Sequence, residues 1–182
     1  MKTLALDIGN VCIAIKPENF SLTLGAAVPR EVLMIQYRSL EHGEITPEEF
    51  FDRAATLIPG GFTPRRVEEA FRSIICDPMP GMRDLVRSLD GRGWRAGFFS
   101  DISVTHLDEF RKRFPESALV SGGAFSFAAG DSKPSEAMFR LFESRFGVPD
   151  LYLDDRAELV EAARRRGWTA EVFPGAAGVL LS

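Results

Sequence analysis

Short apolar runs alternate with helix-forming segments along most of this chain, and this alternation constrains its fold more than any other feature. Five runs are predicted as buried strands, at residues 3–6, 95–99, 124–127, 151–153 and 170–173. Predicted helices lie between the later runs, at residues 81–89, 104–114, 135–146 and 156–166. Strands that alternate with helices form a parallel sheet with helices on both faces. We therefore expect an α/β, Rossmann-like fold with about five parallel strands.

The stretch from residue 16 to residue 78 breaks this alternation because its pattern is helical throughout. Thr46 and Glu49 form a capping box, which marks the start of a helix. A second Thr-Pro start follows at Thr63, and a further helix is predicted at residues 30–41. This stretch is longer than one crossover connection requires, so we expect a small all-helical cap inserted after the first strand. The expected domains are an α/β core at residues 1–15 and 79–182 and a helical cap at residues 16–78.

Composition and charge exclude several classes of function. The 182-residue chain is 45% hydrophobic and 26% charged, with a net charge of −4, as is ordinary for a soluble globular protein. Proteins that bind nucleic acid usually carry a basic face, so this balance argues against such a partner. Neither a signal peptide nor a membrane span is indicated, and the two cysteines lack metal-ligand spacing. We expect a cytoplasmic monomer or homodimer with no nucleic-acid or membrane partner.

Polar residues follow four of the predicted strands. They are Asp7 after the first strand, Ser100 and Asp101 after the second, Lys133 after the third, and Asp154 and Asp155 after the fourth. Ligands of a parallel α/β sheet bind at its C-terminal edge, so these groups are expected to converge there. Carboxylates that are close together repel one another unless a cation intervenes, and a hard divalent ion, Mg²⁺ above all, suits oxygen ligands. The hydroxyl and the ammonium would then bind a phosphoryl group.

Each of these residues also has an ordinary structural interpretation. Asp7 could begin a turn, Ser100 could cap the following helix, and Lys133 could be a surface lysine. Asp154 and Asp155 could complement the positive end of the last helix. Because all four groups occur at successive strand ends, in an order that assembles one pocket, the pattern favours the functional interpretation. His42 and His106 have no partner at ligand spacing, so surface or packing roles are expected for both.

In these segments the sequence resembles the haloacid dehalogenase (HAD) superfamily of hydrolases, most of which are phosphatases. The segments LALDIGNVCI, RAGFFSD, GDSKPSEAMF and LYLDDRAELVEAA are similar, in order, to its four motifs. The resemblance covers essentially the whole chain, and the helical insertion is similar to the superfamily's cap in its most common position. The segment EHGEITPEEFFDRA and the Asp-x-Gly-Asn-Val form of the first motif resemble a small-capped subgroup that includes bacterial sugar-1-phosphate phosphatases.

This resemblance implies a Mg²⁺-dependent phosphatase that acts on a small, sugar-phosphate-like metabolite. Asp7 would be the nucleophile and would form an aspartyl-phosphate that water then hydrolyses. The Asp7 carboxylate, the backbone carbonyl of Gly9 and Asp155 would hold the metal, with Asp154 as a further or water-mediated ligand.

The resemblance also assigns the phosphate-binding residues. Ser100 and nearby backbone N–H groups would hold the phosphoryl oxygens, with Asp101 next to them, and Lys133 would bridge Asp7 and the phosphate. The cap would close over the leaving group and choose the substrate. Phe20, Tyr37, Phe50 and Phe62 fit the packing of the cap as well as the face of a sugar, so both placements are retained for these rings.

Three positions depart from the superfamily's pattern. Gly9 stands where most phosphatases have a second Asp, an acid/base that contributes roughly 10²–10⁴-fold to the rate. Its absence suits a good leaving group, such as an anomeric oxygen or an acyl phosphate. Asp101 stands where Asn or Thr is usual, and one hypothesis is that it partly replaces the missing acid/base. Leu159 stands where many members have an Asn or Asp that orients a metal ligand.

Three other classes of protein share some of these features. A catalytically weak relative that binds a phosphorylated ligand or a protein partner would fit the three departures. A C–Cl hydrolase could use Asp7 on a 2-haloacid, but it needs no metal and leaves the pair Asp154 and Asp155 without a purpose. A phosphate-accepting receiver domain has its acidic pair in the first strand and lacks a helical insertion, so the order of the motifs disfavours it.

Overall fold

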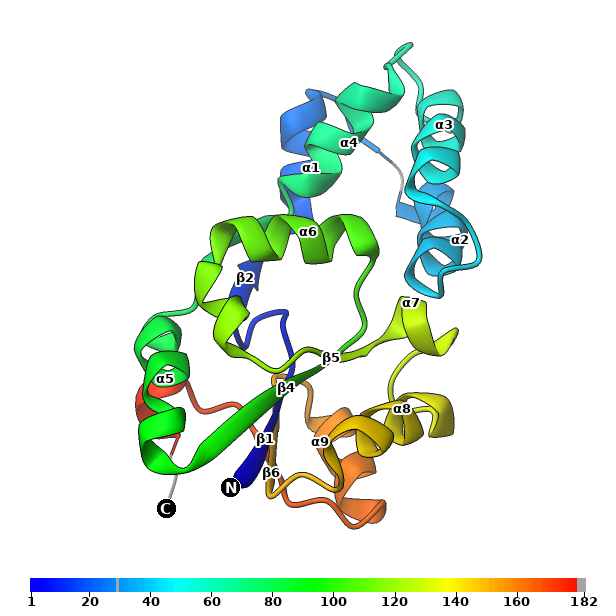
Figure 1. The fold of residues 1–182 in the computed structure, drawn as a ribbon. Coiled ribbons are helices and arrows are strands. Elements are labelled where there is room, and N and C mark those ends of the chain that lie inside the picture. Colours follow the sequence, from blue (N-terminus) through cyan, green and yellow to red (C-terminus); the bar gives the residue numbers. More distant parts are fainter. Residues whose placement is uncertain (29, 180–182) are drawn as a thin grey trace.

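The protein is described by a computed structural model that covers residues 1–28 and 30–179. Its centre is a five-stranded parallel sheet with the strand order β5-β4-β1-β6-β7 (Figure 1). The strands are β1 (Lys2–Leu6), β4 (Trp94–Ser100), β5 (Gly123–Phe125), β6 (Leu151–Asp154) and β7 (Ala170–Val172). Each expected strand is present at or near its expected position, and the prediction of a Rossmann-like parallel sheet is confirmed.

Helices cover both faces of the sheet. They are α5 (Met82–Ser88), α6 (Val104–Arg113), the single turn α7 (Ser126–Ala129), α8 (Glu136–Phe146) and α9 (Ala157–Arg165). Alternate residues of a strand point to opposite faces. Leu4 and Leu6 accordingly pack with apolar residues of α5 and α6, whereas Ala5 packs with those of α8 and α9. Three short 3₁₀ helices complete the core, at Asp90–Arg92, Pro115–Leu119 and Ala176–Gly178.

The inserted segment forms a separate helical cap with its own core. Its helices are α1 (Glu18–Leu24), α2 (Arg30–Glu41), α3 (Pro47–Leu57) and α4 (Pro64–Arg72). The side chain of Thr46 accepts a hydrogen bond from the backbone N–H of Glu49, and Glu49 accepts one from that of Thr46, so the predicted capping box is confirmed. Aromatic side chains such as Phe50 and Phe71 fill the interior of the cap.

A two-stranded antiparallel ribbon joins the cap to the core. It consists of β2 (Ile13–Ile15) and β3 (Ile75–Pro78). The prediction that the inserted stretch is wholly helical is wrong for β3. The chain crosses between the two parts twice, and the crossing segments satisfy their backbone groups by pairing with each other, as in the bond of 2.9 Å from Lys16 N to Ile74 O. In the described part of the chain, no helix is long and apolar enough to cross a membrane.

Candidate active site

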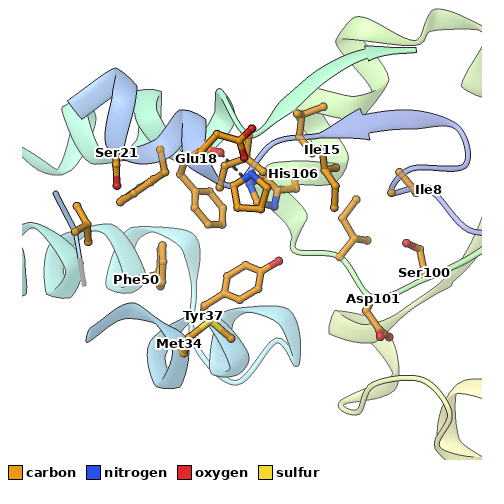
Figure 2. Close-up of a pocket in the computed structure, with 18 residues that line it drawn as sticks. Ile8, Ile15, Glu18, Ser21, Met34, Tyr37, Phe50, Ser100, Asp101 and His106 are labelled. Carbon is orange, nitrogen blue, oxygen red and sulfur yellow. Dashed lines mark hydrogen bonds between the residues drawn. The ribbon is translucent and has the colours of Figure 1, made fainter. Parts of the chain in front are cut away.

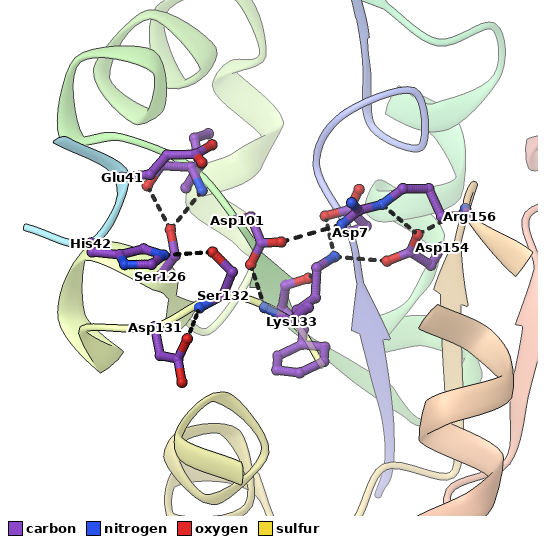
Figure 3. A network of polar contacts seen from close by, with 12 residues as sticks. Asp7, Glu41, His42, Asp101, Ser126, Asp131, Ser132, Lys133, Asp154 and Arg156 are labelled. Atoms are coloured by element: carbon purple, nitrogen blue, oxygen red, sulfur yellow. Dashed lines mark hydrogen bonds and ion pairs between the residues drawn. The ribbon is translucent and has the colours of Figure 1, made fainter. Parts of the chain in front are cut away.

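The three central strands bring their polar ends together at one edge of the sheet. In the register of the sheet Leu6 pairs with Phe98 on one side and with Leu153 on the other. Asp7 and Asp154 directly follow Leu6 and Leu153, and Ser100 follows Phe98 by two positions, so the three residues lie at the same edge of the sheet. All three are buried. Figure 3 shows Asp7 and Asp154 close together, and the side chain of Ser100 hydrogen-bonds to Asp7, so the structure brings these three predicted residues together.

Lys133 lies at the centre of this group. Its Nζ is 2.8 Å from Oδ1 of Asp7 and 2.7 Å from Oδ2 of Asp154. It also donates to the backbone oxygen of Phe99, at 3.1 Å, and contacts the hydroxyl of Tyr152, at 3.3 Å. The whole residue is only 6% exposed, so Lys133 is not a surface lysine.

Burial and charge pairing set the protonation of the two carboxylates. Burial raises the pKa of Asp7, and the Lys133 ammonium and a hydrogen bond from Ser100 oppose this shift only in part. Burial also disfavours the charged form of Asp154, but the Lys133 ammonium and the hydrogen bonds from Lys133 and Tyr152 outweigh it and lower its pKa. The pKa of Lys133 is raised because its two carboxylate partners outweigh its own burial. The site therefore holds a buried cation between two acidic groups of different acidity.

Ser100 and Asp101 take different roles at the end of β4. The N-cap of α6 is Ser103, whose hydroxyl accepts from His106 N at 3.2 Å, so Ser100 does not cap that helix. Asp101 binds the segment that carries Lys133, because its Oδ1 accepts the Lys133 backbone N–H at 2.8 Å. Its Oδ2 accepts from Arg156 at 3.2 Å. Both oxygens of Asp101 are thus engaged, as in a positioning residue.

The predicted metal ligands form one cluster. Oxygen atoms of Asp7, Asp154 and Asp155 lie within 4.8 Å of one another, and Asp155 is exposed whereas the other two are buried. Gly9 lies in the loop directly after Asp7. Lys133 pairs with Asp7 and Asp154, and Arg156 is 3.9 Å from Asp154, whereas none of these ion pairs includes Asp155. Such a set of hard oxygen donors fits a divalent cation of the Mg²⁺ type.

Two side chains of the site were not predicted from the sequence. Arg156 pairs with Asp101, and its backbone N–H donates to Oδ1 of Asp154 at 2.9 Å. The hydroxyl of Tyr152 donates to the other oxygen of Asp154. These contacts orient Asp154, a task that the buried Leu159 cannot perform. The position of Arg156 directly after the acidic pair was the available signal, and Tyr152 could have been found because it shares a face of β6 with Asp154.

Asn10 links the loop after β1 to the exposed carboxylate. Its backbone is in the left-handed region, at φ 54°, which Asn tolerates better than most residues. Its Nδ2 donates to Asp155 at 3.1 Å, and its Oδ1 accepts the backbone N–H of Ile15 at 3.2 Å. One side chain thus contacts both the candidate metal cluster and the strand that leads to the cap.

A cavity of about 480 Å³ lies between this site and the cap (Figure 2). Gly9, Ser100 and Asp101 border it on the core side. Three of the four aromatic rings in question, Phe20, Tyr37 and Phe50, line it, whereas Phe62 lies against Gly60 and packs within the cap. These three rings therefore both pack within the cap and face the cavity.

His106 also lines this cavity, at the point where α6 meets the cap. Its ring stacks on Phe71 with a centroid distance of 3.9 Å, and its Nε2 donates to the backbone oxygen of Phe71 at 2.9 Å. Burial lowers the pKa of His106 to about 4, so the imidazole is neutral near pH 7. The expected packing role describes this residue correctly.

A parallel sheet with a buried Asp after its central strand, a buried Lys, an acidic pair and a helical cap after the first strand is typical of the HAD fold. The sequence matches no family model and no curated protein. Among solved structures, the chain is similar to a HAD family enzyme from Bacteroides thetaiotaomicron. Its magnesium complex gives a TM-score of 0.82 at 23% identity, over 100% of this chain and 96% of that enzyme.

Two further solved structures support the same fold. A predicted HAD-like family hydrolase from Porphyromonas gingivalis has a TM-score of 0.78 at 22% identity, over 94% of this chain and 90% of that chain. The L-2-haloacid dehalogenase from Xanthobacter autotrophicus, with chloropropionic acid covalently bound, has a TM-score of 0.65 at 14% identity, over 93% of this chain and 76% of that chain. These TM-scores establish a shared fold, and at identities of 14% to 23% the similarity concerns the fold alone.

Proposed function

We propose that this chain is a Mg²⁺-dependent HAD-type phosphatase that hydrolyses a small phosphorylated metabolite. The observation that carries the proposal is the buried ammonium of Lys133, which bridges Asp7 and Asp154, two members of the acidic cluster that Asp155 completes. The HAD family enzyme from Bacteroides thetaiotaomicron, to which the chain is similar, has also been solved in complex with magnesium and inorganic phosphate.

The residues would divide the chemistry between them. An oxygen of Asp7 would attack phosphorus, the bond to the leaving oxygen would break, and water would then hydrolyse the aspartyl-phosphate. Ser100 and Lys133 would bind the peripheral oxygens of the phosphoryl group. Asp7, Asp154, Asp155 and the carbonyl of Gly9 would hold Mg²⁺, which would offset the negative charge of the carboxylates and the phosphate.

The acidic cluster favours phosphoryl transfer over C–Cl hydrolysis. The similarity to the haloacid dehalogenase concerns the fold, and C–Cl hydrolysis gives the carboxylates of Asp154 and Asp155 no task. A phosphate ester with Mg²⁺ gives both of them one.

A panel of phosphate esters tests the proposal, with and without Mg²⁺. The protein is expected to release phosphate only with Mg²⁺, and Asp7→Asn is expected to lower the rate by about 10³-fold or more because it removes the nucleophile. Asp84→Asn is the matched control, since its carboxylate is exposed on α5. Binding of phosphate esters without any turnover would contradict the proposal and indicate a catalytically weak binding protein.

A further inference from the structure

The cavity between cap and core is walled mainly by apolar side chains. It lies where the leaving group of a substrate bound at Ser100 would be placed, since Ser100 and Gly9 border it. Ile15 and Ile102 continue the wall on the core side. Its volume of about 480 Å³ is that of a small-molecule site.

Two polar groups at this wall are already engaged within the protein. The hydroxyl of Tyr37 donates to Oε1 of Glu41 at 2.6 Å. The Nε2 of His106 donates to the backbone oxygen of Phe71 at 2.9 Å. These groups add apolar ring surface to the cavity more than free hydrogen-bonding capacity.

The other polar side chains that line the cavity are few. Both oxygens of Asp101 accept bonds from Lys133 and Arg156. Glu18 and Ser21 lie on α1, away from Ser100 in Figure 2. A sugar would bring several hydroxyl groups into this cavity, and hydroxyls that lose water without gaining partners weaken binding.

The charge of the wall also limits the ligand. Among the described residues that line the cavity none is Lys or Arg, whereas Glu18 and Asp101 are acidic. His106 adds no positive charge near pH 7, because burial lowers its pKa to about 4. Among the described lining residues, a second phosphate or a carboxylate on the substrate would therefore meet no Lys or Arg.

We propose that the cavity binds an uncharged, apolar leaving group, so that the substrates are phosphate monoesters of phenols or of branched or cyclic apolar alcohols. This inference rests on the phosphatase function proposed above and replaces the sugar-phosphate-like substrate that the resemblance implied. Gly9 favours the phenol esters among these for an independent reason, because a phenolate leaves without the proton that a second Asp would donate, whereas an alkoxide needs it.

The sharpest test compares two esters of the same shape, 4-ethylphenyl phosphate and 4-(hydroxymethyl)phenyl phosphate. They differ by one terminal methyl or hydroxyl group, which lies far from the reacting bond. 4-Ethylphenyl phosphate is expected to have the higher kcat/KM, by about 10- to 100-fold, because an apolar pocket disfavours a hydroxyl group in place of a methyl group of equal size. Lengthening the alkyl chain by one methylene is expected to raise kcat/KM by up to about fourfold.

Substitutions of residues that line the cavity test whether the cavity causes the preference for 4-ethylphenyl phosphate. Met34→Gln is expected to lower the ratio of the two kcat/KM values, since Met34 lines the cavity and is 42% exposed, so the fold tolerates the change. Leu57→Gln is the matched control, because Leu57 is on α3 of the same cap, is 46% exposed and does not line the cavity. Ile15→Thr is a second variant on the core side.

Calorimetric titration separates this inference from the phosphatase function. The ligands are the two corresponding phosphonates, which cannot be hydrolysed, titrated in the presence of Mg²⁺. Tighter binding of the ethyl compound supports the apolar site even if no ester is turned over, in which case the phosphatase proposal alone fails. Equal or tighter binding of the hydroxymethyl compound overturns the inference, as does faster hydrolysis of sugar phosphates, while the phosphatase function stands.

Discussion

Ile15 lies against Gly9, and a Cβ added to Gly9 would be 3.3 Å from its Cδ1. The backbone of Gly9 is not in the left-handed region, so no conformational demand requires glycine there. The space that an acidic side chain would need next to Asp7 is bordered instead by an apolar side chain. The lack of a second Asp and the apolar wall of the cavity are thus parts of one local arrangement.

Restoring the acid/base is therefore expected to help poor leaving groups most. Gly9→Asp combined with Ile15→Val, which relieves the close contact, is expected to raise kcat for alkyl phosphates by about 10- to 100-fold and for aryl phosphates by much less. Gly9→Asn with Ile15→Val is the control, since Asn has the same size and cannot transfer the proton. Equal rates for the two double variants would show that no acid/base had been restored.

Lys133 is expected to hold the buried carboxylates together as well as to bind phosphate. Lys133→Met leaves Asp7 and Asp154 without their counter-charge and is expected to lower the free energy of unfolding by about 3 kcal/mol. Urea unfolding measures this, and the phosphatase assay should show a loss of turnover. Lys112→Met, at an exposed ion pair with Asp108, is expected to change stability by less than about 1 kcal/mol. An unchanged midpoint of urea unfolding for Lys133→Met would contradict the role of Lys133 in stabilising the buried carboxylates.

Asp155 is expected to act on metal affinity with little effect on folding. It is exposed, so Asp155→Asn should leave the melting temperature without Mg²⁺ unchanged. The rise in melting temperature on adding Mg²⁺ should shrink, because the cluster loses one charged oxygen ligand. Glu158→Gln, at a nearby exposed position on α9, should retain the full rise. A full rise in both variants would place the metal elsewhere.

The burial of His106 makes stability depend on pH. Its folded pKa is about 4 against an ordinary value of 6.5, so the neutral form is favoured in the folded state. The free energy of unfolding is therefore unaffected by the protonation of His106 above pH 6.5. It decreases as the pH falls, by about 3 kcal/mol near pH 4, because the unfolded state binds the proton more readily. Urea unfolding of the wild type and of His106→Phe across this range isolates it. Parallel pH profiles would show that His106 is not the group responsible.

Asp101 is expected to position Lys133 rather than to transfer a proton. Asp101→Asn retains an oxygen for the Lys133 backbone N–H but loses the ion pair with Arg156. Turnover should fall several-fold without being abolished, and the pH profile of kcat should keep its shape. Abolished turnover together with a lost limb of the profile would instead support the acid/base hypothesis.

The sheet and the cap helices were predictable because their signals are local. The continuous buried run of β1 and the Thr46 capping box depend on residues close in sequence. The ribbon of β2 and β3 was missed because Ile13 pairs with Pro78, across the whole cap, and three- or four-residue strands carry no period of their own. Residues 126–127, expected to continue β5, instead begin the short helix α7, where the Ser126 hydroxyl accepts from Ile102 N at 2.9 Å.

Within the candidate site, the strand ends were predictable and the contacts between them were not. Parallel strands bring Asp7, Ser100 and Asp154 to the same edge whatever their partners are. The ion pair of Arg156 with Asp101 depends on where two loops meet, and sequence reasoning treated Asp101 as an isolated carboxylate next to the phosphate. The apolar cavity could not be predicted from the sequence either, because it forms only where α1 and α2 lie over the core.

Asn10 contacts both the strand that leads to the cap and the candidate metal cluster. Its amide contacts Asp155 on one side and the backbone of β2 on the other. A rotation of the cap about the ribbon would pull on β2 and so on the amide that holds Asp155. A ligand that changes the position of the cap is therefore expected to reach Asp155, and with it the candidate cation site, through this one side chain.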